Sequence, residues 1–139
     1  MDARKISDAL SVAPQLSQAD IAAAVQAGFR SILCNRPDGE SYDQPDFSLI
    51  AAAAKQAGLA VMYQPVVSSA IDGSDAAAFA QAVTELPQPV LAYCRSGTRC
   101  TVLWSLSQAG KRPAAEILAV AANAGYDMRA LGPKLEAKA

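Results

Sequence analysis

The chain has 139 residues, of which 52% are apolar and 18% charged, with a formal net charge of −1. This length predicts a single domain over residues 1–139, and the composition argues against a disordered chain. The near-neutral charge argues against nucleic-acid and anionic-membrane partners, because both are bound through basic surfaces.

In the first half of the chain, short apolar runs alternate with Ala-rich stretches. The pattern predicts strands over 5–7, 10–13, 29–34 and 59–63 and helices over 18–27 and 46–57. Ser17 is the expected N-cap of the first helix, and Gly28 ends it. A turn over 35–39 and a polar loop over 40–45 follow the third strand.

In the second half of the chain, a loop precedes a strand and several helices. The pattern predicts a loop over 65–73, a helix over 75–86 capped by Ser74, and a strand over 89–93. Two helices follow, which end near 108 and 124, and Pro113 lies in the first turn of the second. A short helix is expected within 125–139 and places Leu131 and Leu135 on one face. Strands separated by helices predict an α/β fold with a parallel sheet flanked by helices. Sites in such folds lie at the carboxyl ends of strands, here near 34–36, 64–67 and 94–99.

The residues available for chemistry are limited by the absence of histidine and by three cysteines. Without His, the chain cannot use Ser-His-Asp or Cys-His catalysis or a His-ligated metal. Cys34, Cys94 and Cys100 lack CxxC spacing, so we expect no metal and no cofactor. An odd number of cysteines without a signal peptide predicts a reducing, cytoplasmic location. No apolar run is long enough to span a membrane.

The segment LAYCRSGTRC, residues 91–100, carries the clearest chemical signal. It predicts a buried strand that delivers Cys94 to a Gly-containing turn, followed at once by a helix. Backbone N–H groups of the turn, the helix N-terminus and Arg99 all favour an anion there. We therefore expect Cys94 to have a lowered pKa and to act as a nucleophile without a His partner. The alternative is a buried structural Cys beside two solvent-facing arginines.

Residues around Cys94 are candidates for binding a small anionic substrate. Arg99 is the candidate for direct contact with the anion. The other candidates are Arg95, Ser96, Gly97, Thr98, Cys100 and Arg36. Arg95 could instead point to solvent, and Arg36 would extend a basic rim. Cys100 and Cys34 are either redox partners of Cys94 or packed core residues, and packing is the favoured interpretation.

The CRSGTR segment resembles the active loop of rhodanese-type sulfurtransferases and, less closely, that of cysteine phosphatases. Phosphatases of that class have five residues between Cys and Arg, whereas Cys94 and Arg99 are separated by four. Cys100 stands where the phosphatase Arg would fall, and Tyr93 replaces the usual His before the nucleophile. The rest of the chain is similar to dual-specificity phosphatases, which implies a three-layer, cysteine-phosphatase-like fold.

Over nearly its whole length the chain resembles a small bacterial family of phosphatase-like domains. These occur alone or joined to a beta-lactamase-like persulfide dioxygenase, in the beta-lactamase hydrolase-like proteins. The resemblance is carried by SVAPQL at 11–16, GFRSILCNRPDGE at 28–40 and the Cys94 loop. It implies a functional link to a persulfide dioxygenase.

Three functions remain open, all of which use Cys94. The leading expectation is a sulfurtransferase that moves sulfane sulfur from thiosulfate or a persulfide through a Cys94 persulfide, with Arg99 and Arg95 holding the donor. The second is a phosphatase, in which Asp72 is the candidate general acid, although Asp75 nearby is expected only to stabilise the first turn of a helix. The third is a non-catalytic persulfide carrier or redox sensor.

Overall fold

Five strands form one sheet in the computed structural model, which describes residues 1–137. In chain order they are β1 (Arg4–Lys5), β2 (Leu10–Ala13), β3 (Ser31–Cys34), β4 (Ala60–Tyr63) and β5 (Val90–Tyr93). Their order in the sheet is β1-β2-β5-β3-β4, with β1 antiparallel at one edge and the other four parallel. β5 therefore lies at the centre, and Cys94 follows directly from its carboxyl end.

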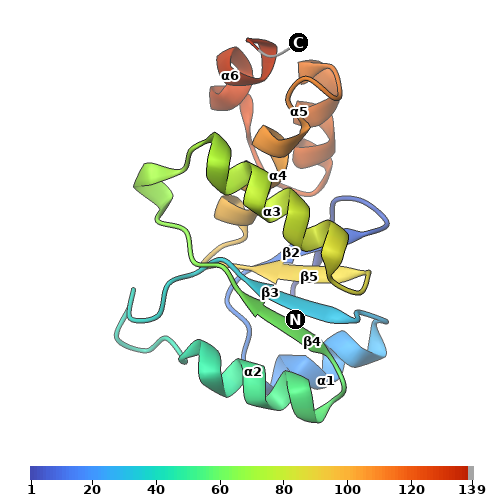
Figure 1. Cartoon of the computed structure of the whole chain (residues 1–139), viewed down its shortest axis with the longest axis vertical. Helices are drawn as coiled ribbons and strands as arrows, with labels where there is room; N and C mark the ends of the chain where they lie inside the picture. The colour runs from blue at the N-terminus through green and yellow to red at the C-terminus, as the bar shows by residue number, and fades with distance from the viewer. Residues whose placement is uncertain (138–139) are drawn as a thin grey trace.

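Helices cover both faces of the sheet (Figure 1). One face carries α1 (Gln18–Gln26) and α2 (Phe47–Gln56), and the other carries α3 (Gly73–Glu85), α4 (Thr98–Gln108), α5 (Ala114–Asn123) and α6 (Gly132–Glu136). Short 3₁₀ turns precede α3 and α6, over Ser68–Ala70 and Arg129–Leu131. The predicted fold class, a helix-flanked parallel sheet in three layers, is confirmed.

The alternation of side chains along the buried strands divides the interior into two cores. In β5, Val90 and Ala92 belong to the core beneath α3 and α4, whereas Leu91 and Tyr93 belong to the core beneath α1 and α2. Both faces of β5 are buried, which explains its uniformly apolar sequence. Cys34, at the end of β3, packs with Leu91 and Tyr93 in the core beneath α1 and α2.

The boundaries of three predicted elements were wrong, and local hydrogen bonds explain the errors. The strand predicted over 29–34 begins at Ser31, because the Phe29 N–H donates to the Ala24 carbonyl of α1. The first strand was predicted over 5–7, but the N–H groups of Ile6 and Ser7 donate to the Leu10 carbonyl and form a hairpin turn instead. The helix predicted over 75–86 begins at Gly73, because Asp72 and not Ser74 is its N-cap. The Asp72 side chain accepts from the Ser74 and Asp75 amides, and Asp75 reciprocates by accepting from the Asp72 amide.

Other expectations for single residues had mixed outcomes. Ser17 caps α1 in a capping box with Asp20, as predicted. Pro113 is the N-cap of α5 and lies one residue before the helix, not within its first turn. Leu135 is fully buried in α6 and Leu131 packs against the same core. Residues 138–139 of the predicted C-terminal segment lie outside the described residues. None of the helices within residues 1–137 combines the length and apolarity of a membrane span.

Candidate active site

Cys94 lies between the end of the central strand and the start of α4. Its side chain is almost fully buried, and the Gly97 N–H donates to its sulfur at 3.1 Å. Gly97 is the N-cap of α4 and has a φ of 90°. Only glycine adopts this left-handed conformation at little cost, so the turn that aims the Gly97 amide at Cys94 depends on this residue.

The local hydrogen bonds make Cys94 an acidic thiol. The pKa of Cys94 is lowered to about 6, and a hydrogen bond from the Cys100 thiol is the main cause. Burial opposes this shift, whereas the backbone N–H groups of Cys100, Gly97 and Ser96 support it. Cys100 lies in the first turn of α4, where backbone N–H groups have no partner inside the helix. Cys94 is therefore largely a thiolate at neutral pH, as the sequence predicted.

The Cys100 thiol has two acceptors for its single proton. Its sulfur lies 3.3 Å from Asn35 Oδ1, and it also contacts the Cys94 sulfur. A thiolate accepts more strongly than an amide oxygen, so we expect ionisation of Cys94 to turn the Cys100 proton from Asn35 toward the Cys94 sulfur. Complete burial raises the pKa of Cys100 itself well above the ordinary value, which keeps it a donor.

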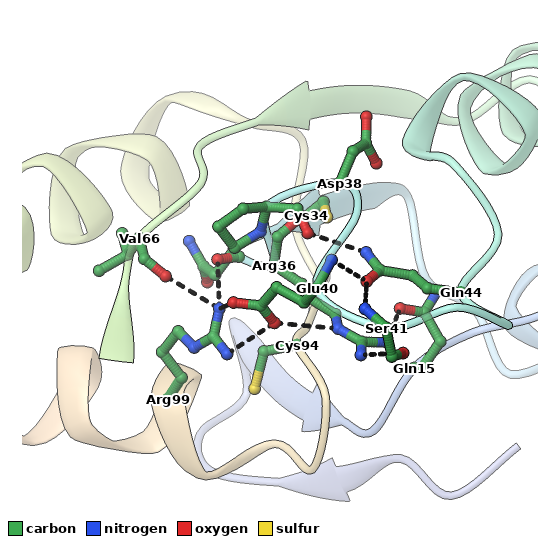
Figure 2. Close-up of polar contacts among 12 residues, drawn as sticks. Gln15, Cys34, Arg36, Asp38, Glu40, Ser41, Gln44, Val66, Cys94 and Arg99 are labelled. Carbon is green, nitrogen blue, oxygen red and sulfur yellow. Dashed lines mark hydrogen bonds and ion pairs between the residues drawn. The ribbon is translucent and has the colours of Figure 1, made fainter. Parts of the chain in front are cut away.

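Arg99 is held by a carboxylate that lies between two arginines, as Figure 2 shows. Its Nη1 and Nη2 donate to the two oxygens of Glu40 at 3.1 and 3.0 Å. Nη1 also donates to the Val66 carbonyl at 2.9 Å. On the other side of Glu40, Arg36 Nε donates to Oε1 at 3.1 Å. Burial opposes the ionisation of Glu40, but the hydrogen bonds from Arg99 and Arg36 prevail, and the pKa of Glu40 is lowered.

The contacts of Arg99 leave one edge of its guanidinium free. Nη1 has three acceptors, whereas Nη2 donates one of its two hydrogens to Glu40. The buried Nε has no hydrogen-bond partner among the described residues. Nε–H and the second Nη2 hydrogen point along the same edge, which matches two oxygens of one tetrahedral anion. A buried donor without a partner is costly, so this edge is suited to a ligand.

A hollow of about 520 Å³ opens over Cys94. It is lined by Glu40, Ser68, Ile71, Cys94, Arg95, Ser96, Thr98, Arg99 and Val102. The structure thus brings the candidates Cys94, Arg95, Ser96, Thr98 and Arg99 together. Gly97 and Cys100 do not line the hollow and instead donate to Cys94 from beneath it.

Two candidate residues lie elsewhere. Asp72 is an exposed N-cap, and the hydrogen bonds from Ser74 and the Asp75 backbone lower its pKa. It lines a separate groove beside α3, so the structure does not place it as the acid that the sequence suggested. Arg36 is buried and donates to Glu40, Gln15 and Ser41 instead of widening a basic rim.

Two polar residues of the site were missed from the sequence. Glu40 and Asn35 both follow β3, whose carboxyl end is next to that of β5 in the sheet. Asn35 accepts from the Cys100 thiol through its side chain and from Arg99 Nη1 through its carbonyl. The available signal was their position in the NRPDGE stretch after a strand end.

Comparison with known proteins supports the fold and identifies the family. A beta-lactamase hydrolase-like protein from Agrobacterium fabrum is 35% identical over 138 residues, which cover 98% of this chain and 32% of that protein. A proposed phosphatase from Neisseria meningitidis has a crystal structure with a TM-score of 0.92 and 38% identity, and the match covers 100% of this chain and 99% of that one. This chain thus spans about a third of the length of its curated relatives.

The fold extends to more distant cysteine phosphatases. The core catalytic domain of the yeast PP-IP phosphatase SIW14, solved with citrate, matches with a TM-score of 0.71 at 18% identity, over 96% of this chain and 82% of that one. The family model for the phosphatase-like domain of beta-lactamase hydrolase-like proteins matches residues 2–111. With a cysteine-phosphatase fold, an acidic Cys94 and this match over most of its length, the chain belongs to the family of phosphatase-like domains of the beta-lactamase hydrolase-like proteins.

Proposed function

We propose that this domain is a cysteine-dependent phosphatase in which Cys94 is the nucleophile and Arg99 binds the phosphoryl oxygens. The observation that carries the proposal is the free Nε edge of Arg99 beside a thiol of pKa about 6. The family match and the Neisseria meningitidis relative also favour phosphate chemistry. Amides of the loop and the N-terminus of α4 would stabilise the negative charge of the bound group.

The proposed reaction has two steps. The Cys94 thiolate attacks phosphorus, an S–P bond forms, and the P–O bond to the leaving group breaks with both electrons on the leaving oxygen. Water then attacks the phosphocysteine, which releases inorganic phosphate and one proton and restores the thiolate. The Arg99 edge holds two oxygens of the phosphoryl group through both steps.

The surroundings of Cys94 favour a leaving group that departs without a proton. Glu40 lines the hollow as a carboxylate bound to Arg99, and Asp72 is engaged at the start of α3. The pKa of each is lowered, so each is ionised at neutral pH. We therefore expect aryl phosphates with acidic phenols to react faster than alkyl phosphates.

Sulfur transfer is the second candidate, and the loop spacing favours it. Only four residues separate Cys94 from Arg99, and sulfite leaves thiosulfate without needing a proton. In this reaction the Cys94 thiolate attacks the outer sulfur of thiosulfate, sulfite departs with the S–S electron pair, and a thiol acceptor takes the sulfur. This candidate includes a link to a persulfide dioxygenase in a cytoplasmic sulfide pathway.

One experiment separates the two candidates. Wild type, Cys94→Ser and the control Cys34→Ala are each mixed with p-nitrophenyl phosphate or with thiosulfate, and phosphate release and intact mass are followed. The phosphatase proposal expects phosphate release that Cys94→Ser lacks and Cys34→Ala retains. A protein one sulfur heavier, reversed by cyanide and without phosphate release, supports the sulfurtransferase instead. Equal turnover in wild type and Cys94→Ser contradicts both.

A further inference from the structure

The peptide group between Ser96 and Gly97 is held at both of its ends. Its N–H, from Gly97, donates to the Cys94 sulfur at 3.1 Å. Its carbonyl, from Ser96, accepts from the hydroxyl of Tyr126 at 3.1 Å. The two groups share one rigid plane and point in opposite directions. A rotation that moved the N–H away from Cys94 would therefore also break the bond to Tyr126.

Tyr126 itself is held by two segments, β1 near the N-terminus and the end of α5. It follows α5 through Gly125, and its own N–H donates to the Ala121 carbonyl at 2.9 Å. The Arg4 guanidinium carbon lies 5.9 Å from the centre of its ring, and Arg4 Nη1 donates to the Ala124 carbonyl at 3.1 Å. β1 and the segment after α5 thus hold the ring against the Cys94 loop.

Two further observations support a specific role for the hydroxyl. A side chain at Gly97 would collide with it, so the loop and the ring are in direct contact. Partial burial raises the pKa of the Tyr126 hydroxyl, which keeps it a hydrogen-bond donor at neutral pH. Tyr126 lies beyond residues 2–111, the part that matches the family model, so the match assigns it no role.

We propose that Tyr126 is a positioning residue, whose hydroxyl holds the Ser96–Gly97 peptide in the orientation that stabilises the Cys94 thiolate. The proposal rests on Cys94 as the nucleophile but not on the identity of its substrate. Tyr126 does not touch the reacting atoms and acts only through the Gly97 N–H. Its effect therefore appears in the acidity of Cys94.

The test is the pH dependence of Cys94 alkylation by iodoacetamide, with the modified peptide identified by mass spectrometry. Tyr126→Phe keeps the ring and the Arg4 contact but removes the hydroxyl. Loss of one neutral hydrogen bond should raise the pKa of Cys94 by about half a unit to one unit and slow alkylation at pH 6 about two- to fivefold. The control is Tyr42→Phe, since Tyr42 is fully exposed, and its profile should match wild type.

Each outcome decides the matter. A folded Tyr126→Phe protein with the wild-type alkylation profile overturns the proposal. If circular dichroism shows that this variant is unfolded, Arg4→Met takes its place, since it loosens the ring but keeps the hydroxyl. A rise in the Cys94 pKa smaller than the one expected for Tyr126→Phe then supports the proposal, and an unchanged Cys94 pKa overturns it. Alkylation needs no turnover. A shifted pKa without phosphatase or sulfurtransferase activity would therefore contradict the proposed function and leave this inference standing.

Discussion

The Cys94 thiolate is stabilised by hydrogen bonds, in a chain that contains no histidine. The Cys100 thiol and three backbone N–H groups supply the hydrogen bonds that lower its pKa to about 6. Hydrogen bonds to a thiolate favour its charged form, and burial of the donor in a low-dielectric core strengthens each bond. Cys100 is packed in the core, as the sequence favoured, and its thiol also lowers the pKa of Cys94.

Replacement of Cys100 by alanine should make Cys94 less acidic. The variant loses the Cys100 thiol, the donor that lowers the pKa of Cys94 most, so this pKa should rise by about one unit. Activity needs the thiolate and is lost as pH falls through the Cys94 pKa, so the acid limb of the pH–activity curve should move to higher pH. The measurement is kcat/KM from pH 4.5 to 8.

Cys100→Ser is the matched variant, because it keeps a donor at the same position. Its acid limb should lie between those of wild type and Cys100→Ala. If Cys100→Ala has an unshifted limb, the backbone amides alone would account for the acidity of Cys94.

At the scale of elements, helix ends decide which carboxylates are available to the site. Asp72 and Asp75 form a capping box at the start of α3, as Ser17 and Asp20 do at α1. The sequence placed an Asp in the correct segment but could not tell a helix cap from an acid catalyst, since both roles use a carboxylate in a loop before a helix.

The two capping boxes offer a comparison of stability with activity. Asp72→Ala and Ser17→Ala should each lower Tm by a few degrees, because each leaves amides of a first helical turn without their acceptor. Both variants should keep the kcat of wild type in the phosphatase assay. A loss of the basic limb of the pH–rate curve in Asp72→Ala alone would assign Asp72 the acid role after all.

At the scale of the whole molecule, the sequence predicted the sheet and the position of Cys94 at its centre better than the groups around that cysteine. The hydrophobic pattern and the turn residues located the four parallel strands, and the CRSGTR segment singled out Cys94 and Arg99 as candidates. Glu40 and Tyr126 could not be placed this way, because they meet the Cys94 loop from 54 and 32 residues away in sequence, counted from Cys94. Only the strand order and the docking of the C-terminal segment bring them there.

The sheet also separates the cysteines that sequence alone had grouped. Cys94 and Cys100 pack in the core under α3 and α4, whereas Cys34 packs in the core under α1 and α2. Burial is the main cause that raises the pKa of Cys34, so it stays a protonated core thiol. Alternation along β3 and β5 explains this division, and it favours packing as the role of Cys34.

Glu40 joins the loop after β3 to α4, so its ionisation is linked to the stability of the whole fold. Its folded pKa lies below the ordinary value of 4.5. The resulting stabilisation is complete above that ordinary value and is lost as pH falls through the lower folded pKa. Glu40→Gln should therefore lower Tm by several degrees at pH 7, and the gap to wild type should shrink as pH falls below the ordinary Glu pKa of 4.5. Glu136→Gln, at an exposed position of α6, is the control and should follow wild type throughout. Thermal melts monitored by circular dichroism measure the effect, and a gap that stays constant with pH would mean that Glu40 contributes through packing rather than through its charge.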